Sequence, residues 1–181
     1  VKALRMLLAS SAQYEELVIK AVDTAFKNGS FSRMNGAEEF GLKIKQDYYP
    51  KSSDEIREYW YACRDLLLQI LEQKKYVSKI SKIIETHYYT WASNPLRFNC
   101  IMLPLVNKIL YLRHNKWLEL YDSLFRMSLD ADFGKDYQGT KKEILCLIDK
   151  LRPDSFSNKL YEAWLKGQMD FKLSEEEIVQ R

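Results

Sequence analysis

The chain has 181 residues and a formal net charge of +3, with 46% hydrophobic and 29% charged residues. This mix is typical of a globular protein, and the mild charge neither supports nor excludes binding to nucleic acid. The chain contains 6 glycines and 4 prolines, so a loop-rich sheet architecture is disfavoured. We therefore expect one domain over residues 1–181, and a chain that begins with valine is consistent with a fragment of a larger protein.

The first third of the chain shows helical patterning. Apolar residues recur at intervals of three and four over residues 2–28, which predicts one helix or two. A segment of loop composition follows, with a short helix expected over residues 37–48. Ser52 and Glu55 then have the spacing of a capping box, which predicts the start of a helix that runs to about residue 73.

The stretch that we expect at the centre of the core is residues 94–112, preceded by an amphipathic helix over residues 76–91. Its apolar residues cover nearly every side of a helix, which predicts burial. Charged residues interrupt it, so it differs from a membrane span, which needs ~20 mostly apolar residues. Pro104 is expected to bend or break this helix, because proline lacks a backbone donor. The residues predicted to be wholly buried are Ile101, Leu105 and Ile109.

The last part of the chain is expected to contain amphipathic helices at residues 116–129, 140–151 and 158–166. Thr140 is expected to cap the second of these, and the polar segment 130–139 is the clearest internal loop. Ser174 and Glu177 repeat the capping-box spacing near the C-terminus. No stretch alternates with a period of two, so we predict an all-α fold of about seven to nine helices. Core positions expected on these helices include Trp117, Leu120, Tyr121, Leu124, Ile144, Leu145 and Ile148.

Two of the expected helices begin alike. Tyr76 and Trp117 each follow a lysine at the start of an amphipathic helix, and they lie about forty residues apart. A second echo relates Trp60, Asp65 and Leu67 to Trp117, Asp122 and Leu124, which have the same spacing. On these features, residues 74–151 resemble the helical repeats of tetratricopeptide, HEAT and PCI-type scaffold subunits, although the small residues that define a tetratricopeptide repeat are missing.

This resemblance implies antiparallel helix pairs packed as an irregular α-solenoid. It also implies a non-enzymatic scaffold with a groove for peptides, proteins or RNA. The alternative is an irregular helical bundle in which the echo is a coincidence.

Two loop patterns suggest ligand chemistry, and neither is complete. Gly134, Gly139, Thr140 and Lys141 approach a phosphate-loop motif, but the order is Gly-Thr-Lys and a helix precedes them instead of a strand. Acidic residues of the same segment match three positions of a calcium loop, but Tyr137 replaces the required glycine. We therefore expect a solvated acidic loop and no cofactor.

The histidines and cysteines form no recognisable catalytic or metal-binding pattern. His87 is expected in the core or at its boundary and His114 in an exposed turn, whereas zinc needs three or four convergent ligands. A nucleophile pair of Cys100 with either histidine stays open, although nothing in the sequence marks it. Because no CxxC pair occurs, we interpret the cysteines as buried, reduced thiols of an intracellular protein in the cytoplasm or nucleus. They are Cys63, Cys100 and Cys146.

One charged pattern points to an anionic partner. Lys75, Lys79 and Lys82 recur at helical spacing and line one stripe of a helix. Clustered cations can follow the phosphates of nucleic acid or contact an acidic partner, and a solvated lysine face is the alternative. The candidate binding residues are Lys74, Lys75, Lys79, Lys82, Arg113 and Lys116.

Because no catalytic motif in the sequence is complete, we predict a non-enzymatic protein-interaction scaffold domain of a larger intracellular complex. Its partners are expected to be proteins, which exposed aromatic residues and the end helices would contact, and no membrane is expected. The alternative function is an RNA- or DNA-binding helical-repeat domain that uses the lysine-rich helix face.

Overall fold

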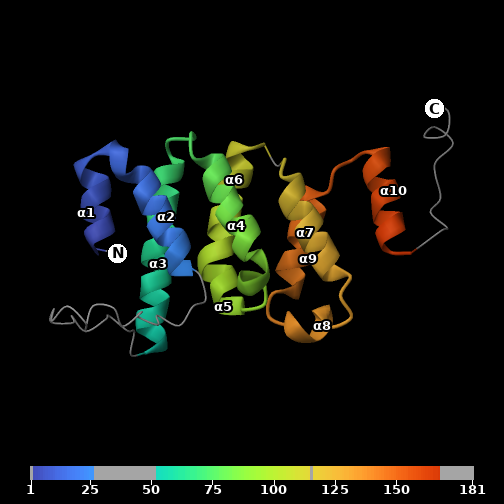
Figure 1. The fold of residues 1–181 in the computed structure, drawn as a ribbon. Coiled ribbons are helices and arrows are strands. Elements are labelled where there is room, and N and C mark those ends of the chain that lie inside the picture. Colours follow the sequence, from blue (N-terminus) through green and yellow to red (C-terminus); the bar gives the residue numbers. More distant parts are fainter. Residues whose placement is uncertain (1, 27–51, 115, 168–181) are drawn as a thin grey trace, which may run out of the picture. The chain divides into compact units, whose positions relative to one another are not determined.

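A computed structural model of the protein describes residues 2–26, 52–114 and 116–167 (Figure 1). These residues form helices joined by turns, and no strand occurs among them. The predicted all-α fold of about seven to nine helices is therefore confirmed. The helix expected over residues 37–48 and the capping pattern of Ser174 and Glu177 lie outside the described residues.

Two compact units divide the chain, Val1–Ile83 and Ile84–Arg181. The boundary falls inside one helix, α4 (Val77–Ala92), which supplies residues to both units. The expectation of one domain over residues 1–181 stays a prediction.

The described residues of the first unit form three helices, a short turn and the start of α4. In chain order it contains α1 (Lys2–Ser10), the 3₁₀ turn η1 (Ala12–Tyr14), α2 (Glu15–Phe26) and α3 (Ser53–Leu71). α3 begins where predicted, because the Ser52 hydroxyl oxygen accepts a hydrogen bond from the Glu55 N–H at 3.1 Å. That bond satisfies one of the unpaired amides of the first turn. Val18, Val22 and Leu67 are fully buried in the core of this unit.

The second unit continues from the last part of α4. It contains α5 (Pro95–Arg97), the π-helical turn η3 (Phe98–Met102), α6 (Leu103–Leu112), α7 (Leu118–Ser128), α8 (Phe133–Asp136), α9 (Lys141–Leu151) and α10 (Phe156–Leu165). α7 and α9 pack side by side (Figure 1). The segment 130–139, predicted to be a loop, contains the short helix α8, so the prediction is wrong for those residues.

The central stretch starts at an asparagine followed by a proline. The Asn94 side-chain oxygen accepts a hydrogen bond from the Arg97 N–H at 3.1 Å. Pro95 takes the next position, where the missing N–H would have had no helical partner in any case. Both signals are local, and they explain why the helical path begins there.

A π-helical turn accommodates the proline in the middle of this path. Pro104 has no N–H, and in a regular α-helix its ring would crowd the Cys100 carbonyl four residues back. η3 lies directly before α6, and the Leu103 N–H donates to the Phe98 carbonyl, five residues back. A π turn takes in one extra residue, which gives the ring room. The helical path therefore continues through Pro104 without a chain break, and regular α-helical geometry is interrupted directly before the proline.

Most predicted core positions are confirmed, and the exceptions lie in the central stretch, where Leu96 and Tyr111 are exposed, and on α9. Leu145 and Cys146 are exposed, so their predicted burial is wrong. The register of the helix instead turns other residues inward, namely Ile144, Leu147, Ile148 and Leu151. His87 is buried and stacks on Trp91, and His114 is exposed, as predicted for both histidines.

A close contact ties the start of α9 to the end of α4 and to α5. Thr140 occupies the N-cap position of α9 as predicted, but its buried hydroxyl makes no capping bond and instead donates to the Ala92 carbonyl at 2.7 Å. Beside it, Gly139 approaches Pro95 so closely that a Cβ atom would lie 2.5 Å from the Pro95 Cγ. A rigid proline ring cannot move aside as a long side chain could, so this position requires glycine.

Leu105 tests the importance of the central helix. It is 0% exposed, and Ile101 and Ile109 are likewise buried as predicted. Leu105→Ala should lower the free energy of unfolding by ~2–5 kcal/mol, because it removes buried apolar surface and leaves a cavity. Asn107→Ala, at an exposed position of the same helix, should stay within about 0.5 kcal/mol of the parent. Urea denaturation of both variants measures the difference, and equal midpoints would contradict the buried position of α6.

Gly139→Ala should destabilise the second unit by ~1–3 kcal/mol, because the new methyl group would overlap the Pro95 ring. Gly134→Ala is the matched control in the same segment, since its nearest contact would be the Lys141 Nζ at an ordinary 3.5 Å. The melting temperatures of the two variants measure this difference in stability. A Gly139→Ala variant that melts with the Gly134→Ala variant would show that the close approach does not exist.

Candidate functional site

α7 begins at a buried tryptophan. Trp117 is 1% exposed, and its indole Nε1 donates a hydrogen bond to a Glu85 carboxylate oxygen at 3.0 Å. The apolar ring is thus buried while its polar atom keeps a partner. Tyr121, one turn further along, is buried as well, whereas Leu118 is 60% exposed. The start of α7 therefore combines two buried aromatic rings with a leucine that is open to solvent.

The turn from α9 to α10 is fixed by a proline and a serine. Arg152 precedes Pro153 and has extended backbone angles (φ −56°, ψ 121°), because proline disfavours a helical conformation in the residue before it. α9 therefore ends there. The Ser155 hydroxyl oxygen then accepts a hydrogen bond from the Asn158 N–H at 3.2 Å and caps α10.

A groove of about 1000 Å³ lies between the start of α7, the end of α9 and α10, and we call it the α7–α10 groove. Its lining is mostly apolar and is formed by Trp117, Leu118, Tyr121, Leu151, Pro153 and Tyr161. The charged side chains that also line it are Lys116, Glu119, Asp122, Lys150, Arg152 and Asp154. Such a volume is at the upper end of the range for ligand sites in proteins, ~300–1,000 Å³.

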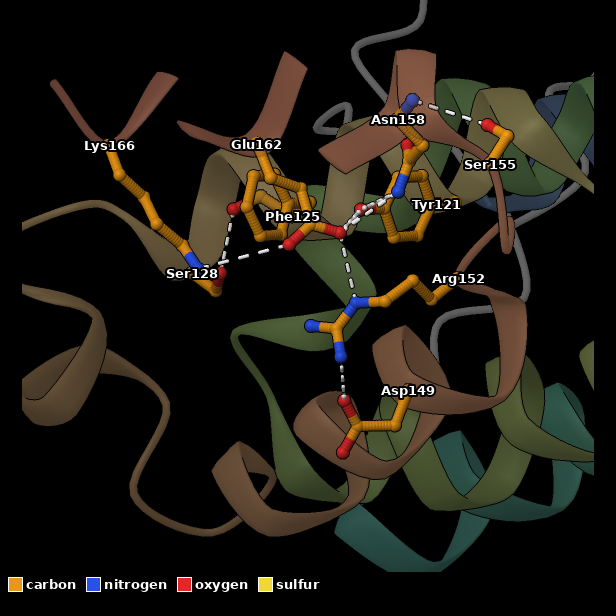
Figure 2. A network of polar contacts seen from close by, with 9 residues as sticks. All are labelled: Tyr121, Phe125, Ser128, Asp149, Arg152, Ser155, Asn158, Glu162 and Lys166. Atoms are coloured by element: carbon orange, nitrogen blue, oxygen red, sulfur yellow. Dashed lines mark hydrogen bonds and ion pairs between the residues drawn. The ribbon is translucent and has the colours of Figure 1, made fainter. Parts of the chain in front are cut away.

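One carboxylate joins α10 to α7 and to the residue that follows α9 (Figure 2). A Glu162 oxygen accepts hydrogen bonds from the Tyr121 hydroxyl and from the Asn158 Nδ2, the latter at 2.9 Å. The same oxygen accepts from the Arg152 Nε at 2.9 Å, and the other end of that guanidinium pairs with Asp149 at 3.0 Å. Three elements therefore converge on one side chain, which is 14% exposed.

This network keeps Tyr121 in its donor form. Burial, followed by the hydrogen bond to Glu162, raises the pKa of Tyr121 above its ordinary value, so the hydroxyl stays protonated at neutral pH. Hydrogen bonds to an ionised acceptor are stronger than those between neutral groups. Removal of the Glu162 carboxylate would leave the Arg152 and Asn158 donors without that acceptor.

A second polar cluster connects α7 and α10. The Asp122 carboxylate pairs with the Arg126 Nε at 3.1 Å and accepts a hydrogen bond from the Tyr161 hydroxyl. The Arg126 Nη2 in turn donates to the Tyr161 oxygen at 2.5 Å. Asp122 lines the α7–α10 groove, but its negative charge is already matched by Arg126.

Two of the four predicted binding lysines of the first unit, Lys75 and Lys79, pair with acidic residues of α2. The Lys75 Nζ is 3.0 Å from a Glu15 oxygen, and the Lys79 Nζ is 2.5 Å from a Glu16 oxygen. The hydrogen bond to Glu15 raises the pKa of Lys75, and the bond from Lys79 lowers the pKa of Glu16. These two charges are therefore matched inside the unit. The other two lysines, Lys74 and Lys82, are exposed.

The remaining two predicted residues belong to the second unit. The Arg113 guanidinium lies 5.4 Å from the Trp117 ring and 3.8 Å from a Glu119 oxygen, so it contacts neighbours of its own unit. Lys116 is exposed and lines the α7–α10 groove. The structure thus places Lys116 at the groove, and the other five predicted residues are not part of its lining.

The groove could not be predicted from the sequence, because the apolar residues that line it have the pattern of core residues. Trp117 and Tyr121 are assigned to a buried helix face, which is correct, but one edge of that face remains open. A signal is present in α10, where Asn158 and Glu162 recur at helical spacing on the side that meets α7. Polar residues on an inward face indicate a buried network, and such a network marks a boundary that apolar packing alone does not fill.

Metal sites and membrane spans are two features that could indicate a class of protein. No group of three or more His, Cys, Asp or Glu residues in the described ranges is placed to hold a metal ion. No helix of the described part of the chain is both long and apolar enough to cross a membrane. Comparison of the chain with protein-family models, curated proteins and solved structures finds no match.

Glu162→Ala should loosen α10, because the variant leaves donors of a partly buried network unsatisfied at a cost of ~1–3 kcal/mol. Hydrogen exchange followed by mass spectrometry should show faster exchange of the α10 amides, with the α3 amides unchanged. Glu143→Ala, at an exposed position of α9, is the control and should leave α10 protection as in the parent. Equal α10 protection in the two variants would show that the network does not hold this helix.

Proposed function

We propose that the protein is a non-enzymatic interaction domain of a larger intracellular complex, built as a helical-repeat-like scaffold. Its partner would be another protein, and the α7–α10 groove would receive a segment of that partner. The observation that carries this proposal is a groove of about 1000 Å³ with a mostly apolar, aromatic lining.

Leu118 gives the groove the character of a protein-binding surface. It is 60% exposed although it lies in an apolar lining beside Trp117 and Tyr161, so a bound side chain could cover it. Trp117 and Tyr121 are already buried, so the apolar area that a partner would newly cover comes from Leu118 and from the partly exposed Tyr161. Covering this lining would therefore stabilise a complex through the hydrophobic effect.

The intracellular part of the proposal is supported by the cysteines. All three are free, with Cys63 and Cys100 buried and Cys146 exposed. An exposed free thiol is typical of a reducing compartment such as the cytoplasm or nucleus, since secreted proteins tend to form disulfides.

Binding to RNA or DNA through the lysine-rich helix face is the second candidate. Clustered lysines remain the reason to consider it, and Lys74 and Lys82 are exposed. The pairing of Lys75 and Lys79 with acidic residues of α2 reduces the positive excess of this face. Binding to phosphates would have to compete with those pairs, so we prefer the protein partner.

Leu118→Glu should abolish capture of the partner, because a charge would enter the apolar part of the groove. The parent and the variant are used as baits in an extract of cells that produce the protein, and stoichiometric partners are identified by mass spectrometry. Leu145→Glu is the matched control, since Leu145 is an exposed leucine of α9 outside the groove lining.

The proposal expects one stoichiometric protein that the parent and Leu145→Glu retain and Leu118→Glu loses by about tenfold or more. If all three baits retain the same proteins equally, the groove is not the contact surface. If no bait retains a stoichiometric protein, the scaffold proposal itself fails.

A further inference from the structure

We infer that the partner segment in the α7–α10 groove is acidic as well as apolar. This inference rests on the proposed function and adds the charge of the occupant. Its basis is the difference between the charged side chains of the lining that already have an ion pair within the protein and those that remain available to a partner.

Several charges of the lining are matched by groups of the second unit. Glu119 lies 3.8 Å from the Arg113 guanidinium, and Arg152 is held between Asp149 and Glu162. Asp122 pairs with Arg126, as described above. These groups would have to give up a partner before they could contact a ligand, so they contribute little to the choice of occupant.

Two lysines of the groove lining remain available to a partner. Lys116 stands before α7 and Lys150 in the last turn of α9, and both are exposed. Among the described residues, no carboxylate forms an ion pair with either ammonium group. The lining has three acidic side chains, Glu119, Asp122 and Asp154. Of these, Asp154, between α9 and α10, forms no ion pair with the described part of the chain.

The available charge of the groove is therefore positive, with two lysines against one aspartate. Carboxylates of a bound segment would be attracted to these lysines, whereas lysines or arginines of a basic segment would be repelled, which is how charge selects among partners. The apolar lining favours a protein segment over nucleic acid, because phosphates gain nothing from apolar surface and the rings of Trp117 and Tyr121 are too buried for bases to stack on them. The expected occupant thus combines apolar side chains for the lining with Asp or Glu for Lys116 and Lys150.

A displayed library of random peptides of about twelve residues tests this inference directly. Selection on the full chain, with an excess of the soluble Leu118→Glu variant as competitor, retains the peptides that need an intact groove. The parent should enrich apolar peptides with an excess of Asp and Glu, and binding should weaken as salt is raised. An enriched peptide is then synthesised with a fluorescent label, and its Kd is measured by anisotropy.

The charge assignment is tested with a double variant, Lys116→Glu with Lys150→Glu. It should bind the acidic peptide about tenfold more weakly and should prefer the same peptide with Lys in place of Asp and Glu. Lys142→Glu is the control, because Lys142 is exposed on α9 outside the lining. Far-UV circular dichroism and melting temperatures confirm that the variants fold.

The outcomes separate the two proposals. Enrichment of neutral or basic peptides, or equal affinity of the acidic peptide for the parent and the double variant, would overturn the charge inference and leave the groove as a protein-binding site. Failure to enrich any peptide that depends on Leu118 would overturn both. Competition of the acidic peptide by a homopolymeric RNA at low salt would identify nucleic acid as the occupant and would also overturn the inference.

Discussion

One partly buried carboxylate joins the elements that line the α7–α10 groove. Glu162 accepts hydrogen bonds from Tyr121 on α7, from Asn158 on α10 and from Arg152 at the end of α9. A carboxylate removed from water needs such partners, so the three donors are held where they are. These bonds join α10 to α7 and to the end of α9 (Figure 2), and the groove lies between the same three elements.

The other wall of the groove is held differently. α7 and α9 pack through apolar side chains, and Trp117 is anchored by burial and by its bond to Glu85. The contact of Gly139 with Pro95 adds a steric restraint near the start of α9. Polar bonds, by contrast, tie α10 to Tyr121 and Arg152, so the two walls include different kinds of contact.

Much of the fold could be predicted because its signals are local. Ser52 and Glu55 lie three residues apart, and Ile101, Leu105 and Ile109 recur at helical spacing, so no tertiary contact was needed to place them. Other features depend on partners far away in the sequence. The sequence indicates a capping role for the Thr140 hydroxyl, which in the structure donates to the distant Ala92 carbonyl. Likewise, no acidic residue lies between Lys75 and Lys79 in the sequence, and Glu15 and Glu16 reach them only from α2.

The groove could not be predicted for the same reason. Its lining comes from three helices, and Trp117, Leu151 and Tyr161 become neighbours only after the second unit has folded. The sequence identified Lys116 as a candidate through its charge, without indicating that an apolar surface lies next to it. Charge and apolar area meet at one place because of the turn at Pro153, which directs α10 to the side of α7.

Photo-crosslinking tests most directly whether this groove is a protein-binding site. A photoreactive amino acid is placed at Leu118 or, for comparison, at Leu145, in cells that produce the protein, and crosslinked peptides are sequenced by mass spectrometry. The account predicts that position 118 alone gives adducts with one protein, through a segment rich in apolar and acidic residues. Identical adducts from both positions, or none from position 118, would contradict it.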